Sequence, residues 1–199
     1  MKHVLTADKI LTERHAKVLL KELGQAKDAA LETKRGLKFV NDYFLIAIAY
    51  NTGLRISELV ALKWGDIEDE FLVVQRGKGG KRRTVYFGNR TRSIFEEFKG
   101  IQRTVFERDC AGDDRLFIGQ RGALTRYAVH IRFKYWVRRC GLPATLSFHS
   151  LRHGFGTRLL DCGVPLSSVR DQLGHCNIAI TSVYLHFTED ARERLSRVL

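Results

Sequence analysis

Three short stretches of the sequence combine residue types that could act together on a phosphate group. The first is T-G-L-R-I-S-E-L at residues 52–59, which contains Arg55, and the second is H-S-L-R-H at residues 149–153. In the third, L-G-H at residues 173–175 is followed nine residues after the histidine by Tyr184. Arginine is a charged, planar fork that matches two phosphate oxygens, and a tyrosine hydroxyl can attack phosphorus. The three stretches therefore predict a site where a tyrosine attacks a phosphodiester held by arginines.

The spacing within these stretches is compatible with one site. His149 and Arg152 are three residues apart in a predicted helix, so their side chains share a face. Nine residues of unbroken helix would separate His175 from Tyr184 by roughly 13 Å and turn them to opposite faces. Gly174 is predicted to interrupt the helix, so the chain can turn and bring both side chains to one phosphate.

The elements that must position these residues are predominantly helical. Apolar spacing and end signals predict one mainly α domain with a small antiparallel sheet, an α+β fold that occupies residues 1–199. The predicted helices span residues 12–24, 37–50, 54–64, 90–109, 127–140, 148–161 and 165–173, and two more begin at residue 177, carrying Tyr184, and at residue 188.

A β-hairpin is predicted between the helices at residues 54–64 and 90–109. Residues 71–74 and 84–87 are rich in β-formers and flank a glycine-rich, basic tip at residues 77–81. Residues 116–118 predict a third short strand. A basic hairpin tip is a suitable place for a mobile cationic side chain.

The charge of the chain suits a polyanionic partner. Lys and Arg number 34 against 22 Asp and Glu, which leaves a formal net charge of +12. An acidic membrane surface is the alternative to nucleic acid, but no predicted amphipathic helix has a strongly basic face. The hydrophobic content is 44%, no apolar run approaches the roughly 20 residues of a membrane span, and the N-terminus has no signal-peptide pattern. We therefore expect a cytoplasmic protein.

In their order and spacing, the three stretches and the glycine-flanked Lys78 resemble the tyrosine recombinase (phage integrase) family, particularly its Xer-like members and integrases. The resemblance runs from about Thr52 to His186. It implies six catalytic residues, namely two arginines, a hairpin lysine, two histidines and the nucleophile. These are Arg55, Arg152, Lys78, His149, His175 and Tyr184.

The resemblance also implies an activity and its partners. The family's catalytic domain cuts and rejoins double-stranded DNA through a 3′-phosphotyrosine intermediate, without a metal or other cofactor, as a tetramer on paired sites. Its separate N-terminal core-binding domain has no counterpart here, so we expect a single catalytic domain. Lys81, Arg82 and Arg83 are further candidates for DNA contacts. Residues 188–199 would dock either on a neighbouring subunit or on the chain's own core.

Other functions are open from the same residues. His149 and His153 have the i, i+4 spacing of a zinc hydrolase, and His175 with Cys176 could complete a metal site. However, Ser150 stands where H-E-x-x-H has its glutamate. A type IB topoisomerase uses the same chemistry, and a non-catalytic DNA-binding protein could use the same scaffold. In the recombinase interpretation, His153 packs its helix or supports a neighbouring group.

A substitution of Lys78 tests whether this lysine is the general acid. Lys78→Ala should slow DNA cleavage by roughly 10²–10⁴-fold, because the leaving 5′-oxygen then lacks a positioned proton donor. Replacing the bridging 5′-oxygen by sulfur should largely remove this defect, since a thiolate leaves without the proton. Arg55→Ala should not be rescued. If the sulfur substrate rescues Lys81→Ala and not Lys78→Ala, Lys81 is the general acid. If it rescues neither variant, His149 is the next candidate for the general acid.

Overall fold

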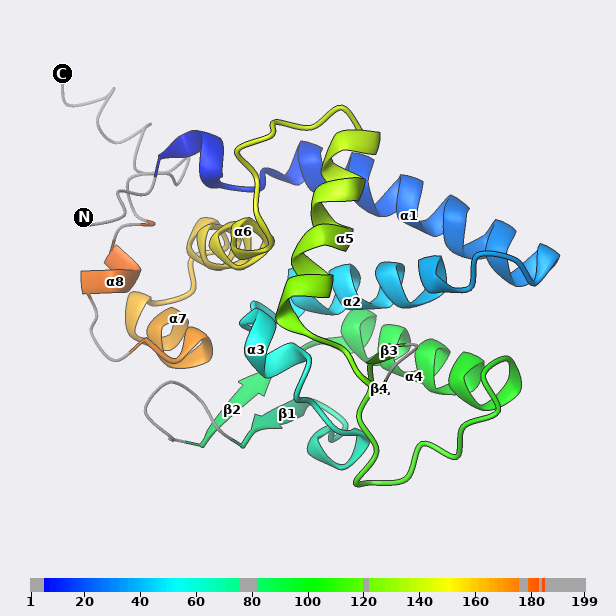
Figure 1. Cartoon of the computed structure of the whole chain (residues 1–199). Helices are drawn as coiled ribbons and strands as arrows, with labels where there is room; N and C mark the ends of the chain where they lie inside the picture. The colour runs from blue at the N-terminus through cyan, green and yellow to red at the C-terminus, as the bar shows by residue number, and fades with distance from the viewer. Residues whose placement is uncertain (1–5, 76–81, 120–121, 176–178, 183, 185–199) are drawn as a thin grey trace, which may run out of the picture.

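A computed structural model of the chain describes residues 6–75, 82–119, 122–175, 179–182 and 184. Its helices gather around one central helix, α2 (Lys38–Thr52), and a short β-hairpin lies below them in Figure 1. This hairpin is one of two antiparallel sheets among the described residues, and each sheet has two strands. The predicted fold class, mainly α with a small antiparallel sheet, is confirmed.

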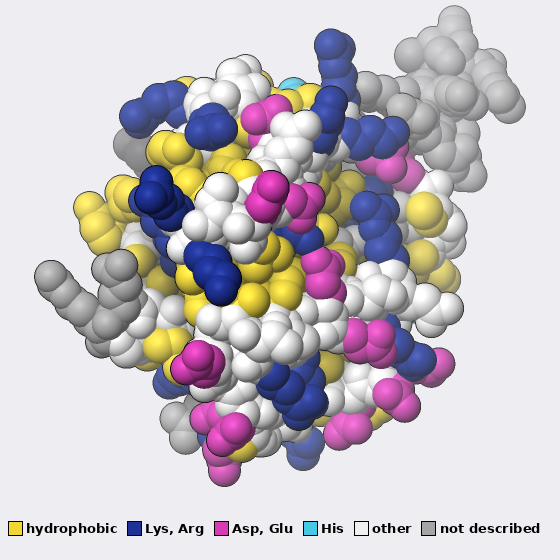
Figure 2. All heavy atoms as spheres, turned by 90° about the vertical axis from the view of Figure 1, so that its right-hand side faces the viewer, with side chains coloured by type: hydrophobic (Ala, Val, Ile, Leu, Met, Phe, Trp, Pro, Cys, Tyr) yellow, Lys and Arg dark blue, Asp and Glu magenta, His cyan; other side chains and the backbone are white. Residues whose placement is uncertain are grey.

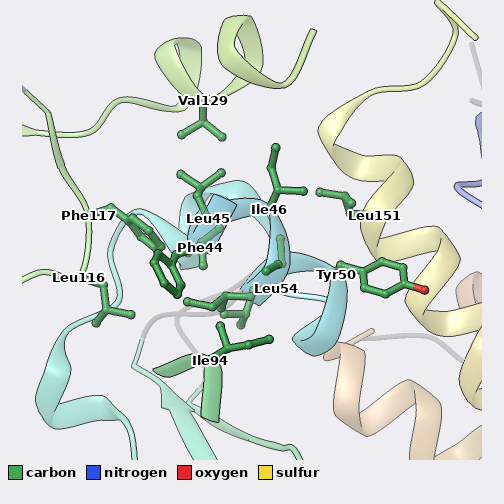
Figure 3. Packing of buried hydrophobic residues seen from close by; sticks show 14 of the residues in the cluster. Phe44, Leu45, Ile46, Tyr50, Leu54, Ile94, Leu116, Phe117, Val129 and Leu151 are labelled. Atoms are coloured by element: carbon green, nitrogen blue, oxygen red, sulfur yellow. The ribbon is translucent and has the colours of Figure 1, made fainter. Parts of the chain in front are cut away.

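The central position of α2 follows from its composition. A helix that is apolar on nearly all sides has to be buried on all sides. Phe44, Leu45 and Ile46 are at most 2% exposed, although they point in different directions from the helix (Figure 3). Phe44 stacks on Phe98 with ring centroids 4.4 Å apart. Packing on every side fixes the end of α2, and the site is built from this end.

Helix α1 (Glu13–Thr33) is longer than the sequence predicts. Thr12 caps its start as expected, with the side chain accepting a hydrogen bond from the His15 backbone N–H at 3.2 Å. The predicted end at Gly24 is wrong, because the helix continues to Thr33. Beyond the glycine, Lys27 and Ala30 remain buried, and Lys27 pairs with a glutamate of α4. Packing of this second half outweighs the cost of a glycine within a helix.

The hairpin follows the prediction closely. Strands β1 (Phe71–Val74) and β2 (Arg83–Tyr86) are antiparallel, with Phe71 opposite Tyr86 and Val74 opposite Arg83. Its predicted tip lies outside the described residues. The predicted strand at 116–118 is largely wrong, because β3 (Ile118–Gly119) pairs only with β4 (Gly122–Ala123). Residues 116 and 117 are instead core side chains, 0% and 1% exposed.

The remaining elements are η1 (Ala7–Lys9), α3 (Ile56–Leu59), η2 (Trp64–Asp66), α4 (Asn89–Thr104), α5 (Arg126–Arg139), α6 (Phe148–Asp161), α7 (Leu166–Leu173) and α8 (Ala179–Ser182). Helices α5, α6 and α7 lie close to their predicted ranges, α4 ends five residues early, and the helix predicted at 54–64 is wrong in extent because α3 covers only four residues before a short 3-10 helix. Gly174 ends α7 in the left-handed conformation, with φ 65°. Helix α8 ends at Ser182, and Tyr184 itself is in a 3-10 conformation. Residue 183 and the residues after 184 lie outside the described residues, so the helix predicted to carry Tyr184 stays a prediction. The predicted helix at 188–199 lies outside the described residues.

Figure 2 shows the face of the molecule opposite α7 and α8. Lys and Arg side chains alternate there with Asp and Glu around an apolar centre. This face therefore presents no continuous basic surface, although the chain as a whole has a net charge of +12. Among the residues that the structure describes, no helix is long and apolar enough to cross a membrane.

Because α1 continues past Gly24, this glycine lies inside a helix, and its replacement should change the stability of the protein. The Gly24 backbone is not in the left-handed region, and an added Cβ would lie 3.8 Å from Tyr43 Cε2, an ordinary van der Waals distance. Gly24→Ala should therefore stabilise the protein by about 0.5–1 kcal/mol, because alanine loses less backbone entropy in a helix. Urea unfolding would measure the change. A destabilised Gly24→Ala protein would contradict a continuous α1.

Candidate active site

Arg55 enters the site from the turn between α2 and α3. Gly53 ends α2 with φ 64°, and a Cβ there would lie 2.4 Å from Phe155 Cδ1, so the turn requires glycine. Arg55 donates from its backbone N and from Nη1 to the Glu58 carboxylate, both at 2.8 Å. Its Nη2 donates to the Gly174 carbonyl at 3.0 Å. The ion pair with Glu58 therefore holds Arg55 in place, and it leaves some of the N–H donors of the guanidinium group available.

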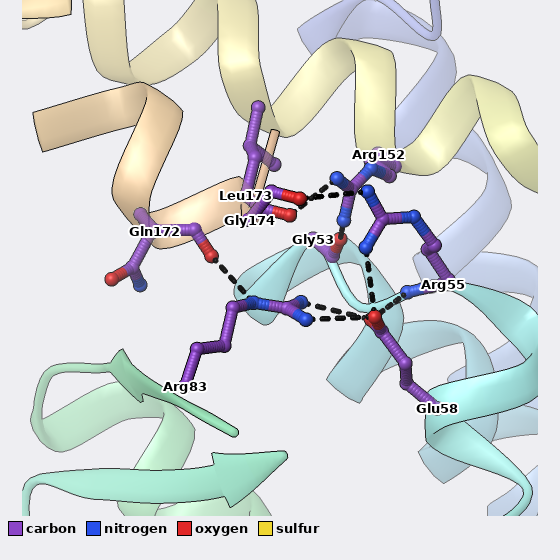
Figure 4. Close-up of polar contacts among 8 residues, drawn as sticks. All are labelled: Gly53, Arg55, Glu58, Arg83, Arg152, Gln172, Leu173 and Gly174. Carbon is purple, nitrogen blue, oxygen red and sulfur yellow. Dashed lines mark hydrogen bonds and ion pairs between the residues drawn. The ribbon is translucent and has the colours of Figure 1, made fainter. Parts of the chain in front are cut away.

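Arg152 reaches the same place from α6 and is almost completely buried, at 1% exposure. Its Nη1 donates to the Gly53 carbonyl at 2.8 Å and its Nη2 to the Leu173 carbonyl at 2.5 Å. Leu173 and Gly174 are consecutive, so the two guanidinium groups meet at the end of α7 (Figure 4). The carboxyl end of a helix favours positive charge.

The paired arginines leave the site with an excess of positive charge. Burial, and next the charge of Arg55, lower the pKa of Arg152 to about 9, which leaves it protonated at neutral pH. Its buried Nε has no partner among the described residues. An anion bound here would reduce the repulsion between the two arginines and would accept a hydrogen bond from the unpaired Arg152 Nε.

Tyr184 lies against α6 and α7 and is 2% exposed. Its ring packs with Phe155, Val169 and Leu173, and a Cβ at Gly156 would lie 2.9 Å from Tyr184 Cε2. Burial raises the pKa of the Tyr184 hydroxyl, and the charges of nearby arginines offset this only in part. Tyr184 is therefore a neutral phenol in this structure.

His153 is the residue whose role the sequence did not reveal. Its Nδ1 lies 3.0 Å from Tyr184 Oη, and the two rings are 5.6 Å apart. His149 follows on the same face of α6, with its ring 4.6 Å from that of His153. The only sequence signal was the position of His153 beside Arg152 in H-x-x-R-H, which does not by itself identify a contact to the tyrosine.

His175 approaches the tyrosine from the other side. Its Nδ1 lies 2.9 Å from Thr181 Oγ1, and its ring is 6.2 Å from the Tyr184 ring. Burial, followed by neighbouring positive charges, lowers the pKa of His175 and of His153 to about 3. The same causes lower the pKa of His149 to about 4, even though it is the most exposed of the three. The positive charge of the site at neutral pH therefore comes from arginine.

The structure brings five of the six predicted catalytic residues together. These are Arg55, Arg152, His149, His175 and Tyr184. The sixth, Lys78, and the candidate DNA contact Lys81 lie outside the described residues. Arg82 is exposed on the hairpin, whereas Arg83 is paired with Glu58 next to Arg55.

The alternative of a metal site includes Cys176, which lies outside the described residues, so the structure describes only its histidines. No group of three or more His, Cys, Asp or Glu side chains in the described part of the chain could hold a metal ion. His149 and His153 lie on one face of α6 as predicted, but His153 Nδ1 is engaged by Tyr184.

Known proteins resemble this chain over most of its length. The model of the phage integrase family matches residues 11–190. Tyrosine recombinase XerC of Herpetosiphon aurantiacus is 35% identical over 160 residues, which cover 79% of this chain and 52% of the relative. Tyrosine recombinase XerD of Ralstonia nicotianae is 35% identical over 205 residues, which cover 97% of this chain and 64% of the relative. The chain spans about half the length of the first of these relatives.

Solved structures share the fold. A XerH site-specific recombinase bound to a palindromic difH substrate superposes with a TM-score of 0.74 at 24% identity, over 96% of this chain and 53% of that one. The crystal structure of XerA recombinase gives a TM-score of 0.72 at 22% identity, over 98% and 64%. At these identities the likeness concerns the fold.

The contact between His153 and Tyr184 can be measured through stability. His153→Phe keeps a ring but leaves the buried Tyr184 hydroxyl without its hydrogen-bond partner, so it should cost about 1–3 kcal/mol. His153→Phe combined with Tyr184→Phe should recover most of this loss, because both polar partners are then removed. Urea unfolding of the four proteins gives the coupling energy.

His149→Phe is the matched control, since His149 makes no such contact, and its cost should not depend on Tyr184→Phe. Independent, additive effects of His153→Phe and Tyr184→Phe would show that the hydrogen bond does not form.

Proposed function

This chain belongs to the phage integrase family, and on that basis we propose that it cuts a DNA strand and rejoins it through a covalent bond from Tyr184 to a 3′-phosphate. The observation that carries the proposal is the meeting of Arg55, Arg152 and Tyr184, which come from three distant parts of the chain. Site-specific recombination of double-stranded DNA in the cytoplasm is the process in which this reaction would serve. The active assembly would be a tetramer on paired sites.

The arginines would supply the electrostatic part of the catalysis. A phosphodiester is anionic and repels nucleophiles, and its pentavalent transition state carries additional charge on the non-bridging oxygens. Two guanidinium groups held side by side bind that charge most strongly in the transition state. The Leu173 and Gly174 carbonyls now occupy part of this donor edge, so a phosphate would add to or replace these hydrogen bonds.

The tyrosine would supply the nucleophile. Tyr184 Oη forms a bond to phosphorus while the bond from phosphorus to the 5′-oxygen breaks, which preserves a phosphoester for rejoining. The phenolic proton passes to a neutral imidazole. His153 touches the hydroxyl directly, and His149, one of the two histidines that the family resemblance implies, lies one ring further away.

Two other groups complete the proposed reaction. His175 stands beside the tyrosine and next to the end of α7, where it could donate a hydrogen bond to the phosphate. The departing 5′-oxygen needs a proton, for which the hairpin lysine Lys78 is the candidate from sequence. DNA would also contact the exposed basic residues of the hairpin, including Arg82.

A trapping experiment tests the proposal. The protein is incubated with nicked duplexes that carry candidate sites, and a covalent protein–DNA adduct is isolated and mapped by mass spectrometry. The adduct should map to Tyr184 and should be absent from Tyr184→Phe, which keeps the ring but lacks the oxygen. Tyr127→Phe is the matched control, because Tyr127 is 75% exposed on α5. An adduct that persists in Tyr184→Phe would refute the assignment.

A further inference from the structure

A buried carboxylate joins two arginines that come from different elements. Glu58 Oε1 accepts from Arg55 Nη1 at 2.8 Å and from Arg83 Nη1 at 2.7 Å. Its Oε2 accepts from the Arg55 backbone N and from Arg83 Nη2, both at 2.8 Å (Figure 4). The Glu58 side chain is 3% exposed. Burial alone would raise the pKa of Glu58, but its bonds to Arg83 and Arg55 lower it to about 2, so the carboxylate stays ionised.

Arg83 is enclosed by these contacts. Its side chain is 12% exposed, and both terminal nitrogens face Glu58 in a bidentate pair. Its Nε points to the Gln172 carbonyl at 3.4 Å, and a Cβ at Gly174 would lie 2.6 Å from Arg83 Cδ. The stem and the fork are thus both packed inside the protein, unlike those of the neighbouring Arg82, which is exposed.

The strand that carries Arg83 is fixed to the same end of α7. The Gln172 side chain accepts from the Tyr86 backbone N at 3.1 Å and donates to the Tyr86 carbonyl at 2.6 Å. Arg83 and Tyr86 are the first and last residues of β2. Strand β2 is therefore held at both ends beside the carbonyls that receive Arg55 and Arg152.

We propose that Arg83 is a positioning residue for Arg55, acting through Glu58, and that it is not one of the residues that contact DNA. This inference rests on the proposed function. With Arg83 present, Glu58 binds Arg55 and Arg83 while Arg152 stands beside them, and these three arginines and one carboxylate give the cluster a net charge of +2 for a phosphate. Without Arg83 the charge falls to +1, and Glu58 attracts Arg55 alone, which draws its guanidinium away from the substrate.

Loss of Arg83 should therefore slow the cleavage step while it leaves the affinity for DNA almost unchanged. Arg83→Gln should slow adduct formation at saturating DNA by roughly 10- to 100-fold, since small displacements of a group that binds the transition state have effects of this size. DNA affinity, and its dependence on salt, should remain close to that of the unaltered protein. Arg83→Lys keeps the charge but not the fork, and it should restore part of the rate.

A salt series distinguishes a positioning residue from a phosphate contact. Each phosphate contact contributes about one to the slope of log K against log salt concentration. Arg82→Gln should lower that slope by about one, whereas Arg83→Gln should leave it unchanged. Arg103→Gln, an exposed substitution on α4, should change neither slope nor rate. A slope lowered by about one in Arg83→Gln, with a normal rate at saturation, would overturn the proposal.

A double-mutant cycle tests whether Arg83 acts through Glu58. In a Glu58→Gln background, adding Arg83→Gln should reduce the rate by less than about 3-fold, because the link is already broken. Full, multiplicative losses would overturn the proposal. Sulfur in place of the bridging 5′-oxygen should not rescue Arg83→Gln. Rescue would mean that Arg83 supports proton donation and not Arg55.

Two controls keep these outcomes separate from general failure. Thermal unfolding shows whether each variant is folded, and if Arg83→Gln is not, Arg83→Lys takes its place in both the salt series and the cycle. If the unaltered chain forms no adduct, the proposed function fails. The salt slope of Arg83→Gln then still decides whether Arg83 contacts DNA.

Discussion

The constraint on which this structure depends is the placement of two like charges at one buried spot. Arg55 and Arg152 repel each other, and burial increases the cost. Three features compensate for this repulsion, namely the backbone carbonyls of Gly53, Leu173 and Gly174, the negative end of α7 and the ionised Glu58. These compensating groups come from the ends of α2 and α7 and from α3, and Glu58 also binds Arg83, so the charge pair connects α2, α3, α6, α7 and the hairpin.

The rest of the architecture can be understood as support for this arrangement. The apolar helix α2 fixes the turn at Gly53, from which Arg55 departs in one direction while the Gly53 carbonyl accepts from Arg152. Gly174 ends α7 so that two successive carbonyls point at the arginines. Tyr184 then packs on the small residue Gly156 and on the side of α7. Tyr184 and the two arginines are thus positioned by the same helix end.

Much of this could be predicted from the sequence, because the determining signals are local. The glycines at 53 and 174 indicated the two turns, and the order of the motifs indicated which side chains belong together. Local signals were insufficient where packing decides. Gly24 indicated a helix end, but buried side chains beyond it, including Lys27, continue α1. His153 and Arg83 have roles that depend on partners 31 and 25 residues away, which no spacing rule identifies.

The long sequence separation of these contacts has a consequence for synthesis. Arg152 meets Gly53 across 99 residues, and Arg55 meets Gly174 across 119. Contacts that close such long loops form more slowly than helices do. Leu173 and Gly174 are also synthesised after both arginines. A nascent chain can therefore form α1 and α2 early while its arginines still lack their arrangement. Under the proposed function, DNA cleavage would therefore require α6, α7 and Tyr184 to be in place beside the arginines.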